Sequence, residues 1–218
     1  QALAIDALDS AIFILRGNTY AEMEEYTLAR GDFNAALRWD PDSSDAFAAR
    51  GFLPVQSGNH SLALPDINRA IELFPLNHDA LVKRGNAYIG LGQTELALRD
   101  LDQAITIAPT NSGYLYSRGL LYLGLTEYES ALKDFDAAID LNLILGNIDP
   151  RHAKPFIGRG RANLRLGYPS QALDDANRGR RILEINFQNS VDWAGYQPTI
   201  DIQLADAHDA LGDAYKSL

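Results

Sequence analysis

Residues 78–111 read HDALVKRGNAYIGLGQTELALRDLDQAITIAPTN. In the first half of this stretch, Leu81 and Gly85 recur at helical spacing and therefore share one face of a helix. In the second half, Ala97 and Leu101 do the same. Glycines separate the two halves and a proline follows the second. The stretch therefore predicts two short amphipathic helices joined by a tight turn.

The same pattern recurs along the chain at a fixed interval. Its glycine column has four members spaced thirty-four residues apart and a fifth after forty-one: Gly17, Gly51, Gly85, Gly119 and Gly160. A parallel alanine column reads Ala29, Ala63, Ala97, Ala131 and Ala172. Small residues at fixed positions let two helices approach closely. Prolines at 41, 75 and 109 are expected to end the second helix of each pair.

These columns resemble those of tetratricopeptide repeats, which are helix–turn–helix units of thirty-four residues. The resemblance implies an all-α fold, a right-handed superhelix (solenoid) of paired helices whose concave face is lined by the first helices. The five repeats are expected at residues 10–43, 44–77, 78–111, 112–152 and 153–186.

Three further segments flank this array. Residues 1–9 resemble the tail of a preceding second helix, and residues 205–218 match the first helix of a sixth repeat, so we expect a longer array. Residues 187–204 form an insertion in which Trp193 and Tyr196 are expected to cover an exposed edge of the stack. A disordered linker is the alternative for this insertion.

Two repeats depart from the regular pattern. Seven extra residues in the fourth repeat amount to about two helical turns, so they predict a lengthened second helix that ends near Gly146. In the second repeat, Pro54 is expected to kink the first helix or end it early, because proline removes a hydrogen bond and clashes with the preceding turn. Pro65 is expected in the first turn of the second helix, where proline is tolerated.

Composition excludes several classes of function. The net charge of −10 argues against a general nucleic-acid binder, and no apolar run is long enough for a membrane span. The absence of cysteine removes disulfides and thiolate metal sites. No catalytic or nucleotide-binding motif is present, and the four histidines are scattered. We therefore expect a soluble, non-catalytic chain without metal or cofactor; nothing in the sequence indicates its compartment.

Arginine and aspartate form a second pair of columns. Arg16, Arg50, Arg84, Arg118 and Arg159 each precede the helix glycine, and sixteen residues later stand Asp32, Asp66, Asp100, Asp134 and Asp175. Opposite charges at a constant separation predict a pair between the two helices of every repeat. Since no pair differs from the others, the pairs indicate structure and not catalysis, and exposed pairs would contribute about 0–1 kcal/mol each.

If the resemblance holds, the residues that face the concave side and could bind a peptide include Asn18, Phe52, Lys83, Asn86, Tyr116, Lys154, Arg161 and Arg165. The asparagines could bond a peptide backbone, and the aromatic rings offer rigid contact area. The fifth repeat has seven basic and three acidic residues. This basic cluster fits two roles equally: it could attract an acidic segment of a partner, or match acidic patches of the same array or of a neighbouring copy.

One subset of the family grips the C-terminal carboxylate of heat-shock chaperones with lysines, asparagines and an arginine. Its first lysine should stand four residues before an asparagine, but this chain has Ile14 before Asn18 and Val82 before Asn86. The sequence therefore argues against an adaptor for chaperone tails.

The leading hypothesis is a protein-interaction module that binds a peptide segment or helix of another protein in the concave groove. Two alternatives stay open. The array could be a structural scaffold that associates with itself through its ends, or it could be the targeting arm of a larger enzyme.

Overall fold

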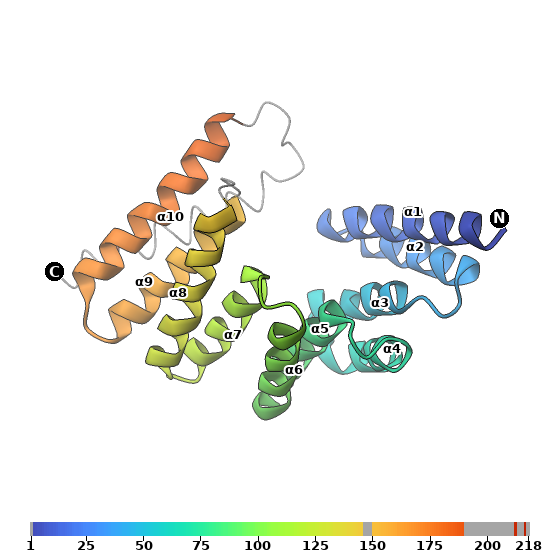
Figure 1. Cartoon of the computed structure of the whole chain (residues 1–218), viewed down its shortest axis with the longest axis horizontal. Helices are drawn as coiled ribbons and strands as arrows, with labels where there is room; N and C mark the ends of the chain where they lie inside the picture. The colour runs from blue at the N-terminus through green and yellow to red at the C-terminus, as the bar shows by residue number, and fades with distance from the viewer. Residues whose placement is uncertain (1, 146–149, 190–211, 213–215, 217–218) are drawn as a thin grey trace. The chain divides into compact units, whose positions relative to one another are not determined.

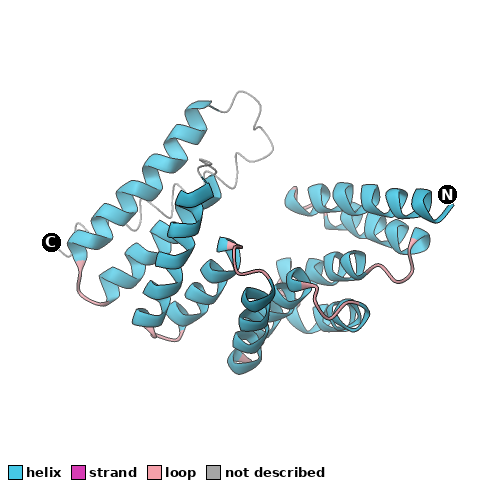
Figure 2. Cartoon of the chain, in the orientation of Figure 1, coloured by secondary structure: helices cyan, strands magenta, loops and turns pink. Residues whose placement is uncertain are grey.

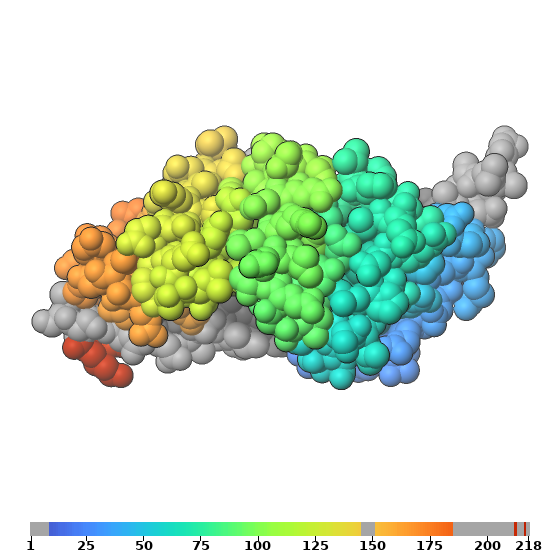
Figure 3. Space-filling model, turned by 90° about the horizontal axis from the view of Figure 1, so that it is seen from below, coloured from blue at the N-terminus to red at the C-terminus, as the bar shows by residue number. Residues whose placement is uncertain are grey.

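The computed structural model describes residues 2–145, 150–189, 212 and 216. Its first unit ends at Ala108 and contains three helical pairs. These pairs are α1 (Ala2–Glu22) with α2 (Tyr26–Trp39), α3 (Ser44–Gln56) with α4 (His60–Leu73), and α5 (His78–Gly90) with α6 (Thr94–Ile107). In a space-filling view the unit forms bands of colour in chain order, from blue to green, as expected when each repeat packs on its neighbours (Figure 3).

The second unit begins at Pro109. It pairs α7 (Ser112–Gly124) with α8 (Tyr128–Leu145), and α9 (Ala153–Arg165) with α10 (Pro169–Asn189), after a short 3₁₀ turn, η1 (Pro150–His152). All regular elements in the described part of the chain are helical (Figures 1 and 2). None of the described helices is both long and apolar enough to cross a membrane.

Local sequence explains where the helices begin and end. Asn77 caps α5 by accepting a hydrogen bond from the Ala80 amide at 2.9 Å, and Ser43 caps α3 in the same way. In the turn between the two helices of a pair, one residue has φ between 60° and 81°. This residue is glycine in three repeats because glycine adopts the left-handed region without strain, but it is Glu24 or Thr126 in two others. The prolines at 41, 75 and 109 follow the ends of α2, α4 and α6, as expected.

The glycine column provides the close helix packing. Phe135 of α8 is fully buried, and a Cβ atom at Gly119 of the column would lie 2.7 Å from its ring, as would one at Gly158, two residues before the column glycine of the fifth repeat. In the second repeat a Cβ at Gly51 would lie 2.8 Å from Ile67 of α4. Large side chains on second helices therefore fill the space that missing Cβ atoms leave on first helices. This confirms the all-α repeat fold.

The helices form two layers within each unit. In the first unit α3 contacts both α1 and α5, and in the second unit α7 contacts α9. The second helices α2 and α4 pack against the first helix of the following repeat. We call the surface of the first helices that points away from the second helices the first-helix face.

The expectation that Pro65 lies in the first turn of α4 was wrong, and Pro54 does not end α3 early. α3 contains Pro54 and still has thirteen residues, the same length as α5 and α7, so Pro54 does not end it early. Pro54 lies in the last turn, where only one hydrogen bond is lost and few residues follow. Pro65 is the sixth residue of α4 and not part of its first turn, and α4 nevertheless continues to Leu73.

The ends of the array also differ from expectation. α1 is continuous from Ala2 to Glu22, whereas we expected residues 1–9 to end a separate helix. No glycine or proline precedes Gly17, so nothing in the sequence stops the helix there. α8 has eighteen residues against fourteen in α6, and α10 reaches Asn189, three residues into the expected insertion. Trp193, Tyr196 and most of 205–218 lie outside the described residues.

Candidate protein-binding site

In every repeat the predicted arginine–aspartate pair joins the first helix to the second. In all five, Nε and Nη2 of the arginine donate to the two carboxylate oxygens of the aspartate, at distances of 2.5–3.0 Å. Such two-pronged pairing fixes geometry as well as charge. The pairs join the first helix to the second, and their identical form in all five repeats indicates a structural role.

These pairs are more buried than expected. The aspartate side chains are 2–9% exposed in four repeats, and only Asp66 reaches 28%. Each arginine also lies over an aromatic ring, for example Arg84 at 5.8 Å from the Tyr88 centroid. Removing one partner of such a pair would leave a buried charge, which is far more costly than loss of an exposed pair.

The arginines also link consecutive repeats, a role that our sequence reasoning missed. Nη1 of Arg50 donates to Asn34 at 2.8 Å, and Nη1 of Arg84 donates to Asn68 at 3.0 Å. The signal was present in the sequence, because each asparagine stands sixteen residues before its arginine. Together with the aspartate pair, these bonds hold three helices around one guanidinium group.

Four of the predicted site residues lie on the first helices of the first unit. Asn18 of α1 is exposed, whereas Phe52 of α3 and Lys83 and Asn86 of α5 are half-buried. The structure brings Phe52 and Lys83 together, with the ammonium nitrogen 6.0 Å from the ring centroid. Asn86 lies three residues after Lys83 and so shares its side of α5.

Lys83 has an unusual electrostatic environment. Burial lowers its pKa, and the negative charges of Asp79 and Asp45 only partly oppose this effect. Among the described residues no carboxylate or carbonyl accepts a hydrogen bond from its ammonium group. The Lys83 side chain is therefore a partly desolvated cation beside the Phe52 ring. A carboxylate from a ligand would stabilise this cation.

The other four predicted site residues lie on the first helices of the second unit, Tyr116 on α7 and three on α9. Tyr116 is half-buried and packs on Phe135 with the ring centroids 5.9 Å apart, so its ring contributes to the core as well as to the surface. Lys154 and Arg161 of α9 are half-buried, and Arg165 is exposed. On α10, Arg178 pairs with Asp174 and Arg180 pairs with Glu184, which reduces their contribution to a basic surface.

No group of three or more histidine, aspartate or glutamate side chains that could hold a metal ion occurs in the described ranges. The arrangement of these side chains is suited to contacting a ligand.

Comparison with known families identifies the repeats. Models of the tetratricopeptide repeat match residues 55–112 and 116–182, and a further model matches residues 10–43. The chain belongs to the tetratricopeptide repeat family. Proteins of this family generally mediate protein–protein interactions. No curated protein sequence matches this chain.

Solved structures share the fold at low identity. The tetratricopeptide repeat protein TTC0263 of Thermus thermophilus superposes with a TM-score of 0.70 at 19% identity, covering 91% of this chain and 98% of that one. PilF of Pseudomonas aeruginosa gives a TM-score of 0.67 at 19% identity, with coverage of 97% and 90%. The first tetratricopeptide repeat domain of Spaghetti (RPAP3), bound to the HSP90 peptide SRMEEVD, gives 0.51 at 20% identity, with coverage of 55% and 97%.

Proposed function

We propose that this tetratricopeptide repeat protein binds an extended segment of another protein on its first-helix face. In the first unit, an acidic side chain of that segment pairs with Lys83. The observation that carries the proposal is the half-buried ammonium group of Lys83, which lies against Phe52 without a hydrogen-bonded acceptor among the described residues. A partner carboxylate would offset the cost of burying this cation.

The neighbouring side chains suit a peptide backbone. The amide of Asn86 offers both a donor and an acceptor on the same side of α5, and the exposed Asn18 offers the same groups on α1. Phe52 supplies a rigid apolar surface of the kind that contributes strongly to binding energy. An extended segment would therefore find polar contacts for its backbone and an apolar contact for one side chain.

The second unit supports the same chemistry. Lys154, Arg161 and Arg165 all lie on α9, where they add positive charge to the first-helix face of a chain with a net charge of −10. An acidic ligand would be attracted to this helix by charge.

A structural neighbour bound to a peptide supports the general mode of binding, since the RPAP3 domain holds the HSP90 peptide SRMEEVD. The specificity proposed here is different, because Ile14 and Val82 stand where a lysine of the chaperone-tail clamp would be. We therefore expect an internal acidic residue, and not a chaperone tail, to be the feature that is recognised.

The test is selection of peptides from a random display library on the immobilised chain, followed by affinity measurement for each selected peptide. Charge reversal by Lys83→Glu should weaken binding by about tenfold or more and remove the enrichment in acidic residues. The matched control is Arg99→Glu, which makes the same change at an exposed position on the second helix α6. Equal affinities for wild-type protein and Lys83→Glu, with folding verified by circular dichroism, would reject the proposal.

A further inference from the structure

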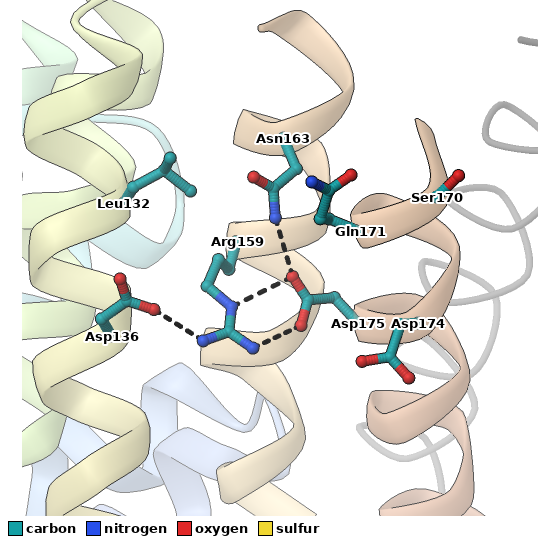
Figure 4. A pocket seen from close by; sticks show the side chains of 8 residues that line it. All are labelled: Leu132, Asp136, Arg159, Asn163, Ser170, Gln171, Asp174 and Asp175. Carbon is teal, nitrogen blue, oxygen red and sulfur yellow. Dashed lines mark hydrogen bonds and ion pairs between the residues drawn. The ribbon is translucent and has the colours of Figure 1, made fainter. Parts of the chain in front are cut away.

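A polar groove of about 630 Å³ lies in the second unit among α8, α9 and α10 (Figure 4). Leu132 and Asp136 border it from α8, Asn163 from α9, and Gln171 and Asp174 from α10. The groove is not part of the first-helix face. Asn163 lies two residues from both Arg161 and Arg165, and at 100° per residue this places it on the opposite side of α9.

The groove coincides with a departure from the repeat pattern. The position of Asn163 holds tyrosine in three other repeats, namely Tyr20, Tyr88 and Tyr122. In the third and fourth repeats that ring stacks on the column arginine, at 5.8 and 5.9 Å. In the first, second and fifth repeats the arginine stacks on a phenylalanine three residues before it, which in the fifth is Phe156 at 5.6 Å. The shorter asparagine thus leaves room between the helices that a tyrosine ring would occupy.

The groove is lined mainly by hydrogen-bond acceptors. Arg159 is already occupied, because it donates to both Asp175 and Asp136. Asn163 is only 8% exposed, and its amide nitrogen donates to Asp175 at 3.0 Å. Its carbonyl oxygen points away from Asp175 toward the α8 side of the groove (Figure 4), and no described residue donates to it. An acceptor that faces the groove, with no donor among the described residues, favours a ligand that brings N–H groups.

The charges of the groove lining also favour a positively charged ligand. Three carboxylates, of Asp136, Asp174 and Asp175, face one guanidinium, that of Arg159. Asp136 is 55% exposed and Asp174 is 60% exposed, so both can reach a ligand, although Asp174 also accepts from Arg178 at 2.9 Å. Leu132 supplies an apolar edge along which an alkyl chain can lie.

We propose that this groove binds an arginine side chain of a partner protein. The alkyl stem lies on Leu132, and the guanidinium donates to the free carbonyl oxygen of Asn163 and to the exposed carboxylates of Asp136 and Asp174. Arginine suits this lining because its five N–H donors are spread over a rigid plane and it carries no acceptor. The surface is distinct from the one proposed to bind an acidic segment, so one partner could use both.

The test uses the full chain and two blocked tripeptides, acetyl-Gly-Arg-Gly-amide and its citrulline counterpart, which has nearly the same shape without the charge. Binding is followed by chemical-shift changes of the Asn163 side-chain amide in a two-dimensional NMR titration. We expect saturable shifts with the arginine peptide and at least about fivefold weaker binding of the citrulline peptide. Asn163→Tyr, which introduces the tyrosine found in three other repeats, should abolish binding. Because this variant lacks the Asn163 side-chain amide, its titration is followed by the backbone amides of α9 and α10.

A second variant keeps the test valid if Asn163→Tyr disturbs folding. Gln171→Lys places a positive charge at an exposed position of the groove and should weaken binding about fivefold or more. The matched control, Gln103→Lys on the exposed surface of α6, should leave the affinity unchanged. Equal binding of the two peptides, or unchanged binding by Gln171→Lys, would overturn the proposal.

Discussion

Replacing glycine by alanine should stabilise the protein at Gly85 but not at Gly51, although the two glycines are equivalent in the column. At Gly85 a new Cβ would lie 3.4 Å from Cγ of Leu101 and 3.5 Å from the carbonyl oxygen of Ala97, which is ordinary contact. At Gly51 it would lie 2.8 Å from Cγ1 of Ile67, 2.9 Å from Cβ of Asp66 and 3.0 Å from the Ile67 amide nitrogen. These atoms are close to or part of the α4 backbone, so they cannot move without the helix.

The expected magnitudes follow from two competing effects. Alanine favours a helix interior over glycine by about 0.5–1 kcal/mol at either position. At Gly85 nothing opposes this gain, so Gly85→Ala should raise the free energy of unfolding by about that amount. At Gly51 overpacking costs about 1–3 kcal/mol, which cancels or exceeds the gain. The two variants should therefore differ by about 1–3 kcal/mol in favour of Gly85→Ala.

The assay is urea unfolding followed by circular dichroism, with midpoints compared because repeat arrays do not always unfold in a single step. Gly31→Ala in α2 is the control for helix propensity alone, since no atom lies within 4 Å of its new Cβ. It should stabilise the chain as Gly85→Ala does. A Gly51→Ala variant as stable as Gly85→Ala would refute the reasoning that close packing maintains the glycine column.

Three further predictions concern the turns, Lys83 and ligand choice. Thr126 has φ of 63°, which is strained for a β-branched residue. Thr126→Gly should therefore raise the free energy of unfolding by about 0.5–1 kcal/mol. The control Thr110→Gly, in a turn without positive φ, should not raise it. Burial lowers the folded-state pKa of Lys83, so the unfolded chain binds more protons between that pKa and the ordinary lysine value of about 10.4. The free energy of unfolding of the wild-type protein should therefore rise with pH across this window, relative to that of Lys83→Met. If the two free energies changed in parallel with pH, the lowered pKa assigned to Lys83 would be contradicted. The peptide SRMEEVD should show no calorimetric binding at millimolar concentration, because Ile14 and Val82 stand at the two places where the first lysine of a chaperone-tail clamp is expected. Micromolar affinity for this peptide would show that the clamp argument is wrong.

Much of the fold follows from features that repeat along the sequence. The glycine, alanine and proline columns predicted the helical pairs, and the constant spacing of arginine and aspartate predicted all five pairs between helices. These predictions succeeded because equivalent residues in equivalent repeats meet the same neighbours. An early end of α3 at Pro54 and a place for Pro65 in a first turn were expected from the isolated helix, whereas packing on adjacent helices lets α3 and α4 continue past these prolines.

The candidate sites were less accessible to sequence reasoning. The repeat pattern predicted which residue types lie on the first helices. It did not predict the contact of Lys83 with Phe52, because the two residues occupy different positions of their repeats and the contact leaves no periodic signal in the sequence. The groove beside Asn163 likewise depends on how three helices meet. The sequence by itself determined the helices, their period and the pairing that repeats in every unit, because those depend on local spacing. Only the tertiary structure decided that Lys83 is half-buried without a hydrogen-bonded acceptor among the described residues and that a groove opens beside Asn163, because burial and unsatisfied polar groups arise from the packing of several helices.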